Sequence, residues 1–109
     1  MSPRNLGLST LTVLHAVSGG CRYGFDVIDA TGLQSGTVYR ALSKLEERGF
    51  LRSKWEPANA ALREKRPRRK YYEVTVRGGQ ELAETRKQLV ALTERSGFDG
   101  AQTAQRKGS

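Results

Sequence analysis

The sequence predicts a mainly α-helical chain that carries one small two-stranded β-ribbon, an α+β fold. Three features of its 109 residues carry this prediction. Apolar residues recur at helical spacing in the first half, two strand-like stretches flank a long polar connection, and a final stretch returns to helical spacing. The length suits one domain, and 37% hydrophobic residues can form a core. Because a domain of this size buries only about two-thirds of its unfolded surface, a second subunit would help.

Two helices are expected near the N-terminus. The apolar face of the first is formed by Leu8, Leu11, Leu14 and Val17. Ser9 is the expected N-cap of this helix, and Gly19 and Gly20 are expected to end it. A second, shorter helix is expected over residues 23–30, ended by the Thr31-Gly32 pair.

The third helix has the clearest pattern, with Ser35 as its expected N-cap, its body over residues 36–48 and Gly49 as its end. Its core-facing stripe is Val38, Ala41, Leu42 and Leu45. The opposite side carries Gly36, Thr37, Arg40, Ser43 and Lys44. Taken alone, this face fits an ordinary solvated surface as well as a nucleic-acid surface. In the second case, small residues would allow close approach, and hydroxyls and cations would contact phosphates and base edges.

Two strands are expected after the third helix, over residues 50–55 and 70–76. The first stretch alternates apolar and polar residues, and the second is rich in aromatic and β-branched residues. The connection over residues 56–69 is too long for a tight turn, so it is expected to be functional or partly disordered. A short helical turn fits its middle, residues 58–64. The pattern therefore predicts an antiparallel ribbon with a long loop.

Positive charge is concentrated in this ribbon. The chain has 19 basic and 11 acidic residues, a net charge of +8, and most of the excess lies between Arg52 and Arg77. The densest run is Lys65-Arg66-Pro67-Arg68-Arg69-Lys70, where Pro67 argues against a helix. A basic run alone fits a solvated loop equally well. At the tip of a ribbon, it instead indicates a polyanionic partner, with nucleic acid as the default.

Several classes of function are disfavoured by the composition. With one cysteine, Cys21, and one histidine, His15, the chain cannot build a disulfide framework or a Cys/His metal site. Asp26 and Asp29 have no convergent base and are taken as surface charges. We therefore expect no enzyme activity, no metal and no cofactor. The chain also lacks an apolar stretch of about 18 residues and a signal-peptide layout, so we expect a soluble, cytoplasmic protein without membrane contact.

The sequence also predicts where four aromatic or titratable side chains lie. His15 is expected to be packed or in an interface. Trp55, at the end of the first strand, is expected to pack against the body of the domain. Tyr71 and Tyr72 should point to opposite faces of the second strand, one into the core and the other free to touch phosphate.

A last helix is expected over about residues 76–95, with Thr75 as its cap and Gly78-Gly79 in its first turn. Leu82, Thr85, Leu89 and Leu92 follow one another at steps of 3, 4 and 3 residues. This short seam fits a partner helix or the protomer's own first helix equally well. Beyond Gly97 the chain is expected to be disordered. The expected units are thus residues 1–76, a last helix (77–96) and a tail (97–109).

The order of helix, short helix, turn, helix and basic ribbon is the winged helix-turn-helix arrangement. Within it, several motifs resemble the PadR family of bacterial transcriptional regulators over about residues 8–82. The motifs are Tyr23-Gly24-Phe25-Asp26-Val27-Ile28, Ser35-Gly36-Thr37-Val38-Tyr39-Arg40-Ala41-Leu42, Leu45-Glu46-Glu47-Arg48-Gly49-Phe50-Leu51, Trp55-Glu56 and Arg66-Pro67-Arg68-Arg69-Lys70-Tyr71-Tyr72-Glu73-Val74-Thr75. The chain departs from the family in a longer wing loop and in having no large C-terminal domain after the match.

The resemblance implies a dimeric winged-helix repressor, with residues 1–76 as a DNA-binding domain and residues 77–96 as a dimerisation helix. It implies DNA-binding roles for Tyr23, Ser35, Gly36, Thr37, Tyr39, Arg40, Arg66, Arg68 and Arg69. The exposed face of the third helix adds Lys44 to these residues, and the basic run adds Lys70. The resemblance also favours dimerisation through the last and first helices. The residues expected there are Leu8, Leu11, Leu82, Leu89 and Leu92.

The sequence thus predicts a homodimer that binds double-stranded DNA at a pseudo-palindromic operator. The third helix would enter the major groove, and the ribbon would contact the backbone or the minor groove. Two alternatives stay open. One is a sensor released from DNA by an apolar small-molecule effector at the dimer interface, which rests on family analogy alone. The other is a winged helix that binds RNA or protein.

Overall fold

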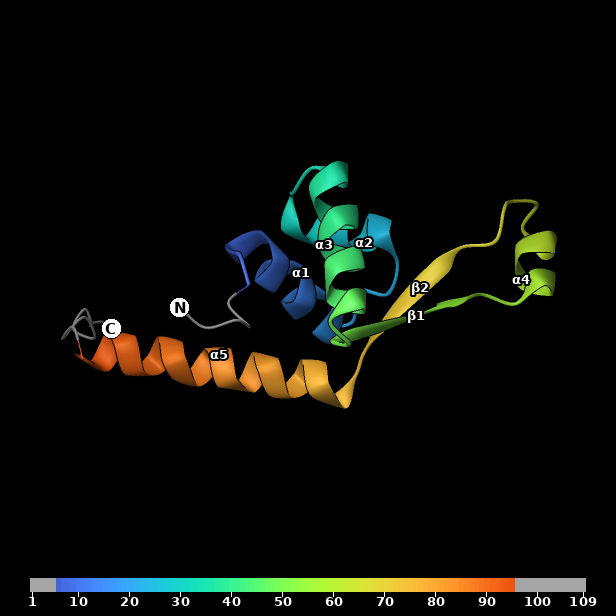
Figure 1. Ribbon diagram of the computed structural model, residues 1–109. Helices are drawn as coiled ribbons and strands as arrows, with labels where there is room; N and C mark the ends of the chain where they lie inside the picture. Colours follow the sequence, from blue (N-terminus) through green and yellow to red (C-terminus); the bar gives the residue numbers. More distant parts are fainter. Residues whose placement is uncertain (1–5, 96–109) are drawn as a thin grey trace, which may run out of the picture.

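The computed structural model describes residues 6–95 (Figure 1). Its elements in chain order are α1 (Leu8–Ser18), α2 (Gly24–Thr31), α3 (Ser35–Glu47), β1 (Leu51–Trp55), α4 (Ala58–Arg63), β2 (Lys70–Val74) and α5 (Val76–Arg95). The fold is mostly helical with one antiparallel ribbon, as predicted, and the expected helical turn in the ribbon connection is α4. Residues 97–109, for which disorder is expected, lie outside the described residues.

The core lies between α1, α2, α3 and the base of the ribbon. Its fully buried side chains are Leu14, Leu42, Leu45, Leu51, Val13, Val27 and Val38. The predicted stripe of α3 is buried in full, because Val38, Ala41, Leu42 and Leu45 are all at most 4% exposed. On α1, Leu14 and Val17 are buried, whereas Leu8 is 82% exposed. The spacing of apolar residues therefore predicted the buried face of α3 better than that of α1.

Two of the expected N-caps are wrong. The N-cap of α1 is Gly7, and that of α3 is Gln34, in neither case with a side-chain hydrogen bond. Ser9 and Ser35 already lie inside the first helical turn. Since an N-cap hydroxyl must precede the first helical residue to accept its N–H bonds, neither side chain can act as the cap. Gly49, at φ +79°, ends α3 as predicted.

The start of α2 gives Asp26 a role that its charge alone did not indicate. Tyr23 is the N-cap, and its backbone N–H donates to the Asp26 carboxylate at 3.4 Å. At the other end, Gly32 adopts φ +73° and its N–H donates to Ile28. Among residues 6–95, no group of three His, Cys, Asp or Glu side chains is placed to hold a metal ion.

The ribbon pairs β1 with β2 in an antiparallel register from Leu51 opposite Val74 to Trp55 opposite Lys70. Tyr72 is buried in the core and Tyr71 is half-exposed on the other face, as predicted for alternating strand residues. The far end of the ribbon, with α4 at its tip, extends away from the three-helix body (Figure 1). Trp55, the last residue of β1, is 57% exposed, so the prediction that it packs against the body is wrong.

The end of α3, the start of β1 and the first turn of α5 pack closely together at one junction. The Thr75 hydroxyl accepts the Gly78 N–H at 3.0 Å, which confirms Thr75 as the cap of α5, and it donates to the Gly49 carbonyl at 2.7 Å. The Thr75 N–H donates to the Phe50 carbonyl at 3.1 Å. A Cβ on Gly78 would lie 2.1 Å from that same Phe50 oxygen. The glycine in the first turn of α5 is therefore required by close backbone approach.

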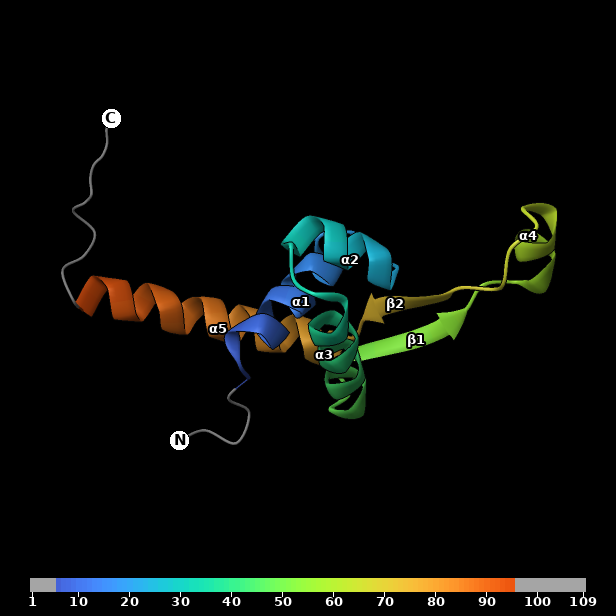
Figure 2. The same cartoon turned by 90° about the horizontal axis from the view of Figure 1, so that it is seen from above.

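From this junction, α5 runs along the body beside α1, and its C-terminal half extends beyond it (Figure 2). Leu82 packs partly against the core, whereas Leu89 and Leu92 are more than half exposed. His15 is exposed on α1, so it is not packed within the protomer. Within the described part of the chain, no helix has the length and apolarity to cross a membrane.

Candidate nucleic-acid interface

The exposed side of α3 is the first part of the candidate interface. Ser35, Gly36, Tyr39, Arg40, Ser43 and Lys44 are exposed, and Thr37 is half-buried. The core stripe on the opposite side of α3 holds this surface in place. The structure therefore brings the predicted hydroxyls and cations of α3 to one solvent-facing side.

The edge of α3 that faces α1 borders a groove that the sequence did not reveal. Its cavity volume is about 260 Å³, and it is lined by Ser9, Thr10, Thr37, Arg40, Ala41 and Lys44. Ser9 and Thr10 come from the first turn of α1, which packs against α3. The spacing of apolar residues predicts which face of α1 is buried. It does not predict which polar residues of α1 lie next to α3, so the groove is visible only in the packed structure.

A pocket lined by aromatic side chains separates the other edge of α3 from the ribbon. The pocket has a volume of about 360 Å³ and is lined by Tyr23, Gly24, Phe25, Tyr39, Trp55, Arg69, Lys70 and Tyr72. The rings of Tyr23 and Phe25 stack with their centroids 5.3 Å apart. The Arg69 guanidinium lies 4.8 Å from the Phe25 centroid, and the Lys70 ammonium lies 5.9 Å from the Trp55 centroid. Two predicted DNA-binding cations thus lie against aromatic faces.

The packing of α2 against α3 in this pocket depends on Gly24. A Cβ at this position would lie 2.4 Å from the Tyr39 ring. The absence of a side chain lets the ring of Tyr39 lie over the start of α2, while Tyr39 keeps 48% of its surface exposed. The structure therefore brings Tyr23 and Tyr39, two predicted DNA-binding residues from different helices, to one site.

A buried carboxylate clamps the ribbon just beyond the strands. Glu56 is 6% exposed and forms an ion pair with the guanidinium of Arg66, whose Nη2 donates to Glu56 Oε2 at 3.2 Å. The Arg69 N–H donates to Glu56 Oε1 at 3.0 Å, and the Tyr23 hydroxyl donates to Oε2 at 3.4 Å. The Arg68 Nε donates to the Glu56 carbonyl at 2.9 Å. This network holds the base of the long loop in one conformation.

The ribbon and its connection, residues 51–74, form the wing. Arg66 differs from the other predicted DNA-binding cations of the wing because its charge is used inside the protein. Its Nε also donates to Glu64 at 2.9 Å, and its side chain is only 18% exposed. Arg68, Arg69 and Lys70 are exposed. The geometry therefore makes Arg66 a positioning residue for the loop, and it leaves the other predicted DNA-binding cations of the wing exposed.

The hydrogen bonds from Arg66 lower the pKa of Glu56 to about 2 from its ordinary value of 4.5, against the opposing effect of burial. The Arg69 N–H, the Arg66 charge and the Tyr23 hydroxyl lower this pKa further. Glu56 and Glu64 in turn raise the pKa of Arg66. Because the pKa of Glu56 is depressed by folding, its ion pair contributes stability above pH 4.5, and this contribution is lost as the pH falls towards 2.

We predict that the Glu56 side chain titrates with a midpoint near 2 in the folded protein and that Arg66→Ala raises this midpoint towards 4.5. The chemical shift of the Glu56 carboxyl carbon measures it directly. The emission of Trp55, the single tryptophan and the neighbour of Glu56, should change over the same pH range. A wild-type midpoint near 4.5 would show that the ion pair does not form.

The opposite face of the ribbon carries a second group of cations. Arg22, Arg52 and Lys54 all lie within 3.8 Å of the Glu73 carboxylate. The Arg22 guanidinium also lies 5.0 Å from the centroid of Tyr71. One carboxylate thus balances only part of the positive charge on this face, which extends the basic surface around the ribbon.

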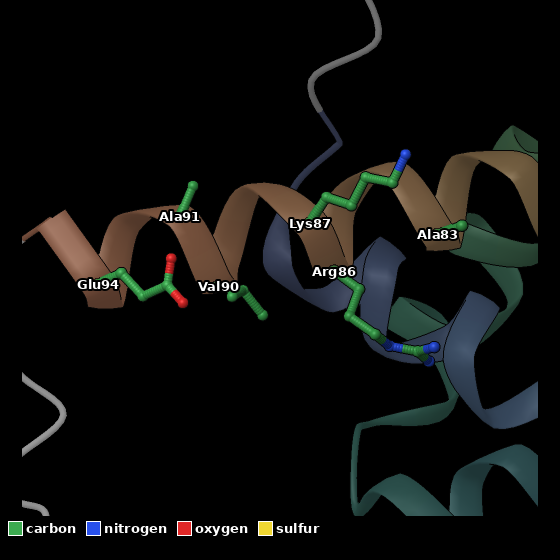
Figure 3. Close-up of a pocket in the computed structure, with 6 residues that line it drawn as sticks. All are labelled: Ala83, Arg86, Lys87, Val90, Ala91 and Glu94. Carbon is green, nitrogen blue, oxygen red and sulfur yellow. The ribbon is translucent and has the colours of Figure 1, made fainter.

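The predicted dimerisation residues divide into two groups. Leu11 and Leu82 are partly buried against the core, whereas Leu8, Leu89 and Leu92 are 82%, 58% and 55% exposed. A groove of about 480 Å³ also lies along α5 (Figure 3). It is lined by Ala83, Arg86, Lys87, Val90, Ala91 and Glu94. The free half of α5 therefore presents apolar residues flanked by both signs of charge.

Comparison with known proteins places this geometry in a family. A family model described as the Transcriptional regulator PadR-like family matches residues 13–84. The chain is similar to a crystal structure of a PadR family transcription regulator from Clostridium difficile R20291, with a TM-score of 0.69 and 20% identity over 86% of this chain and 100% of that chain. It is also similar to a PadR-like transcription factor from Bacteroides fragilis, with a TM-score of 0.71 and 22% identity over 82% and 86% of the two chains.

A third similar structure is that of BpsR from Bordetella bronchiseptica, described for the regulation of its DNA binding by 6-hydroxynicotinic acid. Its TM-score is 0.64, with 22% identity over 92% of this chain and 70% of that one. No curated protein matches the chain. The three structures share the winged-helix fold, and the family model extends from the core of α1 to the first half of α5. Because this match covers well over half of the chain, the protein belongs to the PadR-like family of transcriptional regulators.

Proposed function

We propose that the protein is a sequence-specific DNA-binding regulator, a repressor that binds a pseudo-palindromic operator as a homodimer in the cytoplasm. One observation carries the proposal. The exposed polar and cationic side of α3 adjoins a ribbon whose basic loop is clamped by a buried ion pair. A rigid basic wing beside a helix with small, hydroxyl and cationic side chains fits a DNA major groove and the backbone next to it.

In this proposal, α3 supplies the base contacts. Thr37, Arg40 and Lys44 enter the major groove, and Gly36 allows the helix to approach closely. Ser35 and Tyr39, with Tyr23 from the start of α2, contact phosphates. Residues 1–76 form the DNA-binding unit, and residues 77–96 form the dimerisation helix.

The wing supplies affinity more than specificity. Arg68, Arg69 and Lys70 neutralise phosphates or enter the minor groove, whereas Arg66 keeps the loop in place for them. Each phosphate contact releases counterions from DNA. The number of wing contacts can therefore be measured from the salt dependence of binding.

We predict that Arg68→Ala combined with Arg69→Ala weakens binding to all DNA sequences. The slope of log affinity against log salt should become shallower by about 0.9 for each lost phosphate contact. Fluorescence anisotropy at several salt concentrations measures this slope. Arg22→Ala is the matched control, because Arg22 and Arg69 are both exposed and each guanidinium lies over a tyrosine ring, Tyr71 and Tyr23 respectively, but Arg22 is paired with Glu73. A slope that stays unchanged in the double variant would remove the wing from DNA binding.

Dimerisation is proposed through the free half of α5, together with α1. The exposed Leu89, Val90 and Leu92 are at least half uncovered in the protomer. Burial of such side chains against a second copy would remove apolar surface from water. A two-fold dimer would also present two copies of α3 to successive major grooves.

We predict that Leu89→Glu shifts the protein from dimer to monomer, because a carboxylate would be buried in the interface. Sedimentation velocity measures the change, and affinity for a two-half-site operator should fall with it. Val76→Glu is the control, since Val76 is 80% exposed in the same helix but lies at the anchored end. A Leu89→Glu protein that remains dimeric would place the interface elsewhere.

An effector-responsive regulator is the second candidate. The aromatic pocket between α2, α3 and the ribbon favours it, because the pocket combines several rings with the cations Arg69 and Lys70. Trp55 in its wall makes binding of an aromatic acid visible as a change in fluorescence. If the same compound leaves DNA affinity unchanged at saturation, this candidate is excluded for that compound.

A further inference from the structure

The groove between α1 and α3 has the features of a small anion site. Thr37, Arg40 and Lys44 border it from α3, and Ser9 and Thr10 border it from the first turn of α1. Its volume of about 260 Å³ suits a phosphate group with part of its substituents. Hydroxyls and cations from two helices thus face one small space.

Thr10 is the strongest indication of a ligand. The residue is only 9% exposed, and within residues 6–95 its hydroxyl has no hydrogen-bond partner. Buried polar groups are nearly always paired, since an unpaired one loses its hydrogen bonds to water without replacement. Because Thr10 lines the groove, a ligand in the groove could accept the bond that the protein leaves unmade.

The start of α1 adds a second set of donors. Its N-cap is Gly7, which has no side chain to accept the first N–H groups, and the first turn carries no acidic residue. Helix N-termini with free N–H groups attract anions through these donors and the helix dipole. The backbone and the Thr10 side chain therefore indicate the same class of ligand, an anion with several acceptor oxygens.

We propose that this groove binds one phosphate of the DNA backbone beside each operator half-site. The N–H groups of the first turn of α1 and the hydroxyls of Ser9 and Thr10 donate to the phosphate oxygens, and the positive end of the α1 helix dipole attracts the phosphate charge. The bound phosphate fixes the angle at which α3 enters the major groove, because it ties α1 and α3 to one point of the backbone. This inference rests on the proposed DNA-binding function.

The test compares Thr10→Val with Thr12→Val on the operator. Valine keeps the shape of threonine and removes the hydroxyl. The Thr12 hydroxyl donates to the Leu8 carbonyl at 2.8 Å, so it is a control from the same helix that is already paired. We expect Thr10→Val to retain or raise the melting temperature and to lower DNA affinity by about tenfold or more, in line with the loss of one hydrogen bond to a charged group. Thr12→Val should leave DNA affinity unchanged.

Replacing single phosphates of the operator by neutral methylphosphonates locates the contact. The wild-type protein should lose affinity at one position in each half-site, and Thr10→Val should be much less sensitive at that position. Equal sensitivity of the two proteins at every position would overturn the inference. A lower melting temperature of Thr10→Val with unchanged DNA affinity would also overturn it, because the hydroxyl would then serve the fold.

Three further outcomes distinguish failure of this inference from failure of the proposed DNA-binding function. Inorganic phosphate that shifts the Thr10 amide resonance to saturation without competing with DNA would assign the groove to a free anion and overturn the backbone contact. A wild-type protein that binds no duplex would overturn the proposed function itself, and the groove assignment with it. Operator binding that keeps its sequence preference while Thr10→Val matches the wild type would overturn the groove assignment alone.

Discussion

Gly78→Ala is expected to destabilise the fold by about 2–3 kcal/mol, in the upper part of the range for overpacking. The new Cβ would lie 2.1 Å from the Phe50 carbonyl oxygen. That oxygen cannot move freely, because it also accepts the Thr75 N–H at 3.1 Å. The first turn of α5 would have to separate from the end of α3 and the start of β1. Urea unfolding followed by circular dichroism measures the loss.

Gly79→Ala is the matched control for this substitution. Gly79 is the next residue of the same helix, and a Cβ there has no heavy atom within 4 Å. Alanine at an open helical position should stabilise the protein by about 0.5–1 kcal/mol. If Gly78→Ala were as stable as Gly79→Ala, the close approach of α5 to Phe50 would not exist in solution.

Arg40→Ala is expected to reduce the preference for the operator over random DNA by about 1–3 kcal/mol, or roughly 5- to 150-fold. Arg40 lies on the exposed side of α3, where a guanidinium can contact a guanine through two hydrogen bonds. Arg40→Lys is the second variant of the series. It keeps the charge but not the planar pair of donors, so operator preference should fall nearly as far as with alanine. Competition binding with operator and random duplexes measures both preferences.

Equal losses on operator and random DNA would assign Arg40 to the DNA backbone. If Arg40→Ala lost equal affinity for operator and random DNA, and Arg40→Lys restored both, Arg40 would be a phosphate contact. The base contacts would then have to come from Thr37, Lys44 or the wing.

Apolar spacing was enough to predict the helical core. The stripe of α3 is buried in full, and the expected ribbon, terminal helix and Thr75 cap are all present. The buried stripe of α3 and the Thr75 cap depend on neighbours within one or two turns, and each strand has its own local pattern, so the sequence contains the information. The expected caps Ser9 and Ser35 were wrong because an N-cap depends on where the preceding chain turns, which spacing does not determine.

The internal contacts of the wing could not be predicted from the sequence. The basic run predicted a charged tip, but the sequence could not show that Arg66 would be held by the buried Glu56. Glu56 collects its partners from the loop that leads into β2 and from Tyr23 at the start of α2, and these meet only in the folded chain. Trp55 was likewise predicted to pack against the body, whereas it lines the rim of the aromatic pocket and stays 57% exposed.

The polar groove beside α1 was likewise invisible in the sequence. The apolar face of α1 indicated which side would be buried, and Ser9 suggested only a cap. Thr10 became a candidate because packing of α1 on α3 buries the residue in a groove without giving its hydroxyl a partner among the described residues. A single buried polar group can therefore be more informative about function than an exposed one.

Selection of bound fragments from random duplex DNA, followed by footprinting, tests the central claim most directly. We expect enrichment of a pseudo-palindrome whose half-sites lie about one helical turn apart, as two copies of α3 in a two-fold dimer require. Protection should cover both half-sites and the backbone next to each. Failure to enrich any sequence above background, or efficient competition by structured RNA, would contradict the assignment of this protein as a sequence-specific DNA-binding dimer.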